Sequence, residues 1–111
     1  ARDVLMPTAS EREVAVICAS PLHGGLLGSM RNHWIEQGRF ADLHGKLGRV
    51  EELLAGEGET ISRLGLRYLL TDSNVSLVLS GAATIEELEE VVAVSNGHYL
   101  SPELISRIES A

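Results

Sequence analysis

Two short apolar runs stand out in the hydrophobic pattern of the chain. The first, Val14–Ala19, is rich in branched residues, ends in Ser-Pro and is followed by glycines. Such a run is too short for a typical helix and is typical of a buried parallel strand that leads into a loop. The second, Ser76–Leu79, runs through a glycine turn directly into a helix. We therefore expect two parallel strands with a loop at each carboxyl end.

The remaining apolar positions recur mostly at helical spacing. They predict helices over Asp3–Arg12, Leu47–Ala55 and Thr60–Thr71, a helix that starts at Thr84 and is closed by Asn96-Gly97, and a last helix from Ser101. Residues Ser20–Gly45 carry glycines and no clear period, so we expect a long loop that holds Trp34 and Phe40. Gly56–Gly58 separates the two middle helices.

Two helix starts carry clear capping signals. Thr84 and Glu87 form a capping box, in which the hydroxyl bonds the amide three residues on and the carboxylate reaches back. Ser101 precedes Pro102, which suits the first helical position. These signals predict that the second strand leads into a helix within a few residues.

The predicted fold class is α/β, with two parallel strands and surrounding helices. A parallel pair alone leaves both strands with an unpaired edge and makes no independently stable sheet. We therefore expect residues 1–111 to form a single partial domain, completed by further strands or by association. The chain starts at Ala1 rather than methionine, which also favours a processed or excised piece.

Composition narrows the classes of partner. The net charge is −7 and the nine basic residues are scattered, which argues against a nucleic-acid surface. No apolar run approaches the roughly 20 residues that span a bilayer, so we expect no membrane partner. The single cysteine, Cys18, cannot form an internal disulfide, which favours a reducing, cytoplasmic setting. The four histidines lack the spacing of a zinc site, so we expect no metal.

The two strand ends suit an anionic ligand. A turn at Ser20–Leu22 offers backbone amides, and Gly24 and Gly25 would let the backbone approach the ligand closely. The turn before Thr84 lies at a helix N-terminus, which also favours anions. The alternatives are that the glycines only make a tight turn and that the glutamates after Thr84 are a solvated helix start. Trp34 could line a cleft or pack the long loop down.

Taken together, these residues resemble the C-terminal third of the aldo/keto reductase family. The resemblance is clearest over Val14–Gly28 and Ile61–Ile108 and implies the last two strands of a TIM-type (β/α)8 barrel, within an enzyme that uses NADPH or NADH. Its signatures are Ser20-Pro21-Leu22 with Gly25-Leu26-Leu27, the Leu64–Leu70 stretch, Gly81-Ala82 with Glu86–Glu90, and Leu100–Leu104. Ala19–Leu22 is similar to the branch that acts on sugars, such as L-galactose and related aldose dehydrogenases, although most members have tyrosine at the position of Ala19.

The resemblance implies specific cofactor contacts. Ser20, Leu22 and Gly24 would meet the pyrophosphate of NAD or NADP. Gly81, Ala82 and Thr84 would meet the adenosine ribose or its 2′-phosphate, and Glu90 stands where an asparagine often holds adenine. The chain departs from the family because Ser80 replaces a usual proline and Glu87 an arginine or glutamine. A carboxylate at Glu87 would repel a phosphate, so NADH and NADPH both remain candidates.

The family's catalytic Asp, Tyr, Lys and His come from the N-terminal half of its barrel, so the resemblance implies none here. Tyr68 and Tyr99 are predicted on a helix and in a turn, and neither pairs with a lysine. The chain is then a cofactor-binding piece of an oxidoreductase that acts on a sugar or aldehyde. The alternative is a non-catalytic remnant that serves as a structural or oligomeric interaction module.

Overall fold

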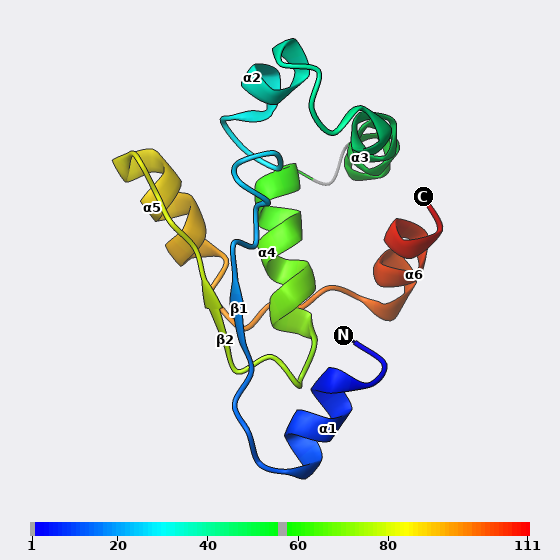
Figure 1. Ribbon diagram of the computed structural model, residues 1–111, viewed down its shortest axis with the longest axis vertical. Helices are drawn as coiled ribbons and strands as arrows, with labels where there is room; N and C mark the ends of the chain where they lie inside the picture. Colours follow the sequence, from blue (N-terminus) through cyan, green and yellow to red (C-terminus); the bar gives the residue numbers. More distant parts are fainter. Residues whose placement is uncertain (1, 56–57) are drawn as a thin grey trace.

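The computed structural model describes residues 2–55 and 58–111, which form an α/β unit (Figure 1). Gly56 and Glu57, within the predicted separator Gly56–Gly58, lie outside the described residues. The elements are α1 (Leu5–Glu11), β1 (Ile17–Ala19), α2 (Arg31–Glu36), α3 (Ala41–Leu54), α4 (Ile61–Thr71), β2 (Leu77–Leu79), α5 (Ile85–Ala93) and α6 (Pro102–Ser110).

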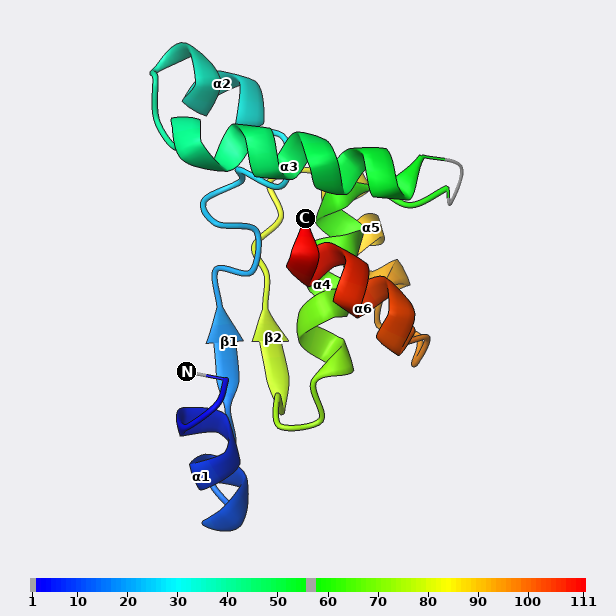
Figure 2. The ribbon, with the colours of Figure 1, turned by 90° about the vertical axis from the view of Figure 1, so that its right-hand side faces the viewer.

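The two strands lie side by side and run in the same direction, as expected. β1 pairs with β2 in parallel, with Ile17 opposite Leu77 and Ala19 opposite Leu79. Helix α4 packs against β2, and α3 crosses above the carboxyl ends of the strands (Figure 2). The predicted fold class is confirmed in this α/β arrangement, and both strands deliver their loops to the same end of the sheet.

The first strand is shorter than the predicted Val14–Ala19 because residues at its predicted start take part in the turn that ends α1. Glu13 adopts a left-handed φ of 56°, and the amide of Val14 donates to the carbonyl of Ala9 at 2.8 Å. The turn at Glu13 and this hydrogen bond end α1, and the strand is formed only from Ile17. Helix α1 is also shorter than predicted, and α5 ends at Ala93, before the predicted Asn96-Gly97 stop.

The prediction of one long loop over Ser20–Gly45 was wrong in its second half. Helix α2 forms within it, and α3 begins at Ala41, six residues before the predicted start. Phe40 takes a left-handed φ of 59° immediately before α3. Leu43 extends the apolar series of α3 by one turn, a signal that the glycines at 45 and 48 obscured.

The small core is centred on α4 rather than on the sheet. Leu64 and Leu66 of α4 are 3% and 2% exposed, and Leu26, from the loop after β1, is 2% exposed. Thr60 caps α4 by accepting a hydrogen bond from the amide of Arg63. Because α4 contacts α3, β2 and α5, it holds the two strand-end loops in place.

The strands themselves contribute exposed apolar side chains. Ile17, Leu77 and Leu79 are 56%, 48% and 53% exposed, although β-branched and leucine residues of a parallel strand are normally buried on both faces. Among the described residues, the sheet has these two strands only. The same part of the chain contains no helix with the length and apolar character that crossing a membrane requires.

Candidate functional site

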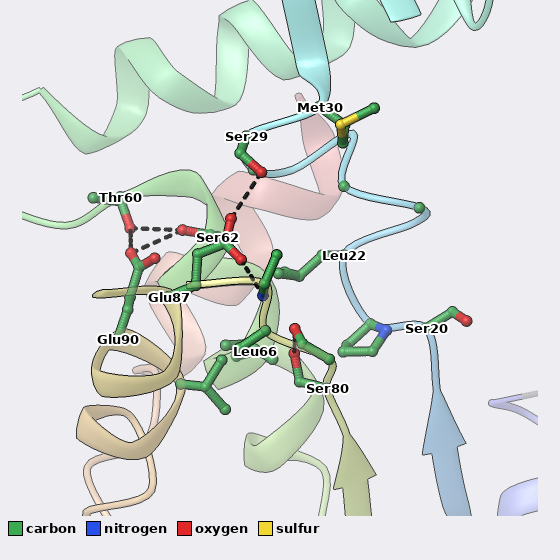
Figure 3. Close-up of a pocket in the computed structure, with 18 residues that line it drawn as sticks. Ser20, Leu22, Ser29, Met30, Thr60, Ser62, Leu66, Ser80, Glu87 and Glu90 are labelled. Carbon is green, nitrogen blue, oxygen red and sulfur yellow. Dashed lines mark hydrogen bonds between the residues drawn. The ribbon is translucent and has the colours of Figure 1, made fainter. Parts of the chain in front are cut away.

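A cavity of about 720 Å³ lies beyond the carboxyl ends of β1 and β2, where α4 and α5 meet the strand-end loops (Figure 3). We call it the loop pocket. Its walls come from the first loop (residues 20–30), the second loop (residues 80–84), the start of α4 and one side of α5. Loops at the carboxyl ends of parallel strands are where α/β proteins bind their ligands.

The first loop is held in an unusual backbone conformation by contacts with distant residues. Ser20 and His23 adopt left-handed φ values of 56° and 50°, which non-glycine residues rarely do outside functional or tightly constrained sites. Gly24 and Gly25 continue the turn with φ values of 63° and 79°. Leu26 anchors the loop in the core.

Trp34 packs the first loop and does not line the loop pocket. Its indole Nε1–H donates to the carbonyl of Gly24 at 2.9 Å. The ring also meets Phe40 edge-on and lies beneath the guanidinium of Arg39, 4.8 Å from the ring centroid. Of the two roles considered for Trp34, the structure supports loop packing.

The second loop is held by the start of α5. The hydroxyl of Thr84 accepts from the amide of Glu87 at 3.2 Å, and the Glu87 carboxylate accepts from the amide of Ala83 at 2.7 Å. This is the predicted capping box, with the carboxylate reaching one residue further back. Glu87 also accepts from the hydroxyl of Ser29 at 2.8 Å, so its carboxylate joins the two loops (Figure 3).

These donors lower the pKa of Glu87 below its ordinary value of 4.5. The largest cause is the hydrogen bond from the Ala83 amide, followed by the one from the Ser29 hydroxyl. Both donors favour the charged form of the carboxylate. Glu87 is therefore anionic at neutral pH in the wall of the loop pocket.

A second carboxylate, that of Glu90, lies one turn further along α5. It accepts from the hydroxyl of Thr60 at 2.6 Å and from that of Ser62 at 2.9 Å. Ser62 is 7% exposed, so its hydroxyl requires a partner, and Glu90 provides one. Glu90 thus fixes α5 against α4 and places a negative charge at that end of the pocket, on the opposite side from Ser20 (Figure 3).

The loop pocket offers main-chain donors and no basic side chain. Within residues 2–55 and 58–111, its lining includes the carboxylates of Glu87 and Glu90 but no lysine, arginine or histidine. Across the same residues, no hydrogen bond occupies the backbone amides of Leu22, Gly24 or Gly81. An anion here would bind to backbone amides, away from the carboxylates.

The structure brings together most of the residues predicted as a cofactor site. Six of the seven line the loop pocket: Ser20, Leu22, Gly24, Gly81, Ala82 and Glu90. Thr84 does not line it, and its hydroxyl instead accepts from the Glu87 amide as the cap of α5. Its contribution in the structure is to fix the second loop.

Sequence reasoning missed three polar residues of the pocket wall: Ser29, Thr60 and Ser62. Ser29 fell within the predicted loop, where its partner Glu87, 58 residues away, could not be inferred. Thr60 and Ser62 were assigned only to a helix start. The i, i+2 spacing of two hydroxyls at that start is the signal that could have indicated a shared acceptor.

No metal centre emerges in the part of the chain that the structure describes, where histidine, cysteine and carboxylate side chains form no group of three or more around a common point.

The loop pocket thus lies at the carboxyl ends of two parallel strands and beside the N-terminus of α5. The sequence profile of the aldo/keto reductase family matches residues 2–111. The chain belongs to this family. An aldo/keto reductase carries its ligands at the carboxyl ends of barrel strands, which is where the loop pocket lies.

Two known proteins match nearly the whole of this chain but only part of their own length. A curated relative, the uncharacterized oxidoreductase YqkF of Bacillus subtilis (strain 168), is 26% identical over 114 residues, covering 95% of this chain and 37% of the relative. The thermostable aldo-keto reductase Tm1743, solved with the inhibitor epalrestat, superposes with a TM-score of 0.69 at 25% identity, covering 98% of this chain and 34% of that chain. The chain therefore spans about a third of the length of these relatives.

Proposed function

We propose that the loop pocket binds a nicotinamide dinucleotide and that this chain is the cofactor-binding part of an oxidoreductase barrel. One observation carries the proposal: six predicted cofactor residues, five from two separate loops and one from α5, line one cavity at the carboxyl ends of β1 and β2. Membership of a family of oxidoreductases supports the choice of cofactor. A cavity of about 720 Å³ falls in the range of small-molecule sites.

The two loops would hold different parts of the dinucleotide. The first loop would hold the pyrophosphate, through the backbone amides near Leu22 and Gly24 and the Ser20 hydroxyl. The second loop would hold the adenosine ribose at Gly81 and Ala82, with Thr84 fixing the loop and Glu90 at the adenine end. The unoccupied amides of Leu22, Gly24 and Gly81 support this assignment, because they are the donors that a phosphate group requires.

When bound, the nicotinamide supplies or accepts a hydride. The residues of this chain would bind and orient the cofactor and leave the proton transfer to groups outside it. Tyr68 lies on α4 with its hydroxyl donating to Glu109, and Tyr99 is 66% exposed before α6. Neither lines the loop pocket. We therefore assign no catalytic residue to this chain.

We further propose that residues 1–111 are a partial domain, the C-terminal third of such a barrel, and that its substrate is a sugar or another aldehyde. The exposed apolar residues of β1 and β2 support the proposal that the domain is partial, because the side chains that fill the interior of a closed barrel would cover them. The similarity of Ala19–Leu22 to the L-galactose dehydrogenase branch supports a sugar as the substrate.

Calorimetric titration of the protein with NADH and NADPH tests the cofactor assignment. A Gly81→Leu variant should weaken dinucleotide binding about tenfold or more, because Gly81 lines the pocket and an added Cβ there meets no atom within 4 Å in the fold itself. Gly48→Leu is the matched control, since Gly48 is equally open and lies outside the pocket. The proposal fails if neither dinucleotide binds at millimolar concentration or if Gly81→Leu binds as the unmodified protein does.

The exposed apolar strand residues also favour a second candidate, an interaction module that covers its sheet with another copy of itself. Ile17, Leu77 and Leu79 would then lie in a dimer interface. Sedimentation equilibrium distinguishes the two candidates. A stable dimer that dissociates in a Leu77→Glu variant and binds no dinucleotide would favour the module over the cofactor site.

A further inference from the structure

The two carboxylates of the loop pocket bear on which dinucleotide it accepts. Both belong to the side of α5 that lines the cavity, and both accept hydrogen bonds from donors of this chain (Figure 3). Glu87 is fixed by Ser29 and Ala83, and Glu90 by Thr60 and Ser62. Their negative charges are therefore fixed features of the cavity wall.

Glu87 also occupies the donor that an anion would need at this end of the pocket. Backbone amides of a loop that precedes a helix can bind an anion when no other acceptor occupies them. Here the Ala83 amide, in the second loop just before the N-cap Thr84, already donates to Glu87 at 2.7 Å. A phosphate at this position would have to displace the carboxylate, and no basic side chain of the described lining would compensate its charge.

A ribose hydroxyl faces a different environment at the same position. A hydroxyl can donate to a carboxylate, and each carboxylate oxygen has more than one lone pair. The Oε1 and Oε2 atoms of Glu87 each accept one hydrogen bond from this chain, so each retains capacity for another. The end of the pocket that repels a phosphate can therefore accept a hydrogen bond from an unmodified sugar.

We propose that Glu87, assisted by Glu90, makes the loop pocket selective for NAD(H), whose adenosine ribose carries free hydroxyls, and excludes the 2′-phosphate of NADP(H). This inference rests on the proposed function, which places the adenosine ribose at the second loop. Glu87 is then a specificity-determining residue that acts by charge and by occupying the loop amide of Ala83.

The test compares two pairs of ligands that differ only in the 2′-phosphate: NADH with NADPH, and adenosine 5′-monophosphate with adenosine 2′,5′-bisphosphate. Their dissociation constants are measured by calorimetry at low ionic strength, where charges are least screened. The unmodified protein should bind the unphosphorylated member of each pair about tenfold more tightly. Added salt should reduce this preference, because repulsion between charges is screened.

Neutral variants locate the origin of the preference. Glu87→Gln should reduce the ratio about fivefold, mainly by tightening the 2′-phosphorylated ligand, and Glu90→Gln should reduce it by a smaller factor. Glu86→Gln is the control, because it removes the same charge from an exposed residue of the same helix that does not line the pocket. Its ratio should match that of the unmodified protein.

The results separate this inference from the proposed function. Equal binding of both members of a pair, a preference for the phosphorylated member, or a ratio unchanged by Glu87→Gln would overturn the inference and leave the cofactor site standing. Failure of all four ligands to bind would overturn the cofactor site and the inference together.

Discussion

The two strand-end loops form one pocket but are built in different ways. The first loop is held by residues distant in the sequence, with Leu26 in the core and Trp34 bonded to the carbonyl of Gly24. The second loop is held within a few residues of itself, by the Thr84 cap and the Glu87 carboxylate. The difference indicates that the first loop depends on the packed core, whereas the second forms together with α5.

The largest expected effect comes from removing the core anchor of the first loop. Leu26→Ala should lower the free energy of unfolding by about 2–5 kcal/mol, because it leaves a cavity beside α4. Ile85→Ala, at the start of α5, should lower the free energy of unfolding by less than about 0.5 kcal/mol, since Ile85 is 72% exposed. Urea unfolding followed by circular dichroism measures both values. Equal losses would contradict the proposed dependence of the first loop on the core.

Adjacent glycines of the first loop should differ in their tolerance of a side chain. Gly24→Ala should cost about 1–2 kcal/mol, because φ is 63° and the added Cβ meets no atom within 4 Å. Gly25→Ala should cost about 1–3 kcal/mol more than Gly24→Ala, since its Cβ would lie 2.8 Å from the Cβ of Met30. Thermal unfolding of the two variants side by side checks the order, and a smaller loss for Gly25→Ala would contradict it.

Loss of the helix cap should have a moderate effect confined to the second loop. Thr84→Ala should lower the free energy of unfolding by about 1 kcal/mol, because the α5 amide loses its acceptor. Thr84→Ser keeps a hydroxyl and should retain most of the stability. Amide hydrogen exchange should show faster exchange at the start of α5 while the first loop keeps its rates. Faster exchange in both loops would mean that they are not independently held.

The smallest effect concerns the side chain that joins the two loops. The pKa of Glu87 is lowered in the fold, so its contribution to stability is present above the ordinary value of 4.5 and is lost as pH falls through the lowered pKa. Glu87→Gln should therefore lose less stability than the unmodified protein as the pH is lowered from neutral into this acid range. Urea unfolding at a series of pH values measures this, with Glu86→Gln as the control for charge. Identical acid dependence in Glu87→Gln and the unmodified protein would show that the contact contributes nothing.

The same contrast explains how far the sequence could predict the structure. The Thr84–Glu87 and Ser101–Pro102 signals act within four residues, so the starts of α5 and α6 were confirmed closely. Helix α2 was not predicted, because Trp34 contacts Gly24 and Phe40, which pattern analysis cannot relate to one another. The true start of α3 at Ala41 was missed for a different reason, since glycines within α3 weaken its helical pattern.

In the candidate site, too, contacts between residues distant in the sequence were the ones that could not be predicted. The glycine turns at the strand ends pointed to the two loops, and the resemblance to the aldo/keto reductase family indicated the six residues that line the pocket. The bond from Ser29 to Glu87 joins residues 58 positions apart and became apparent only in three dimensions. The sequence also gave no indication that Glu90 is bonded to Thr60 and Ser62 rather than exposed to solvent.

The buried apolar residues of the described chain come from helices and loops, and none comes from β1 or β2. The loops of the pocket and the buried residues that hold them therefore lie in one continuous stretch of chain. The strands mainly orient the two loops toward the same end of the sheet. Such a piece could be grafted onto the remaining strands of another barrel, provided that the recipient covers the exposed side of the two strands. If the loop pocket binds the dinucleotide as proposed, recombination between related barrels at this boundary would exchange nucleotide preference as one unit.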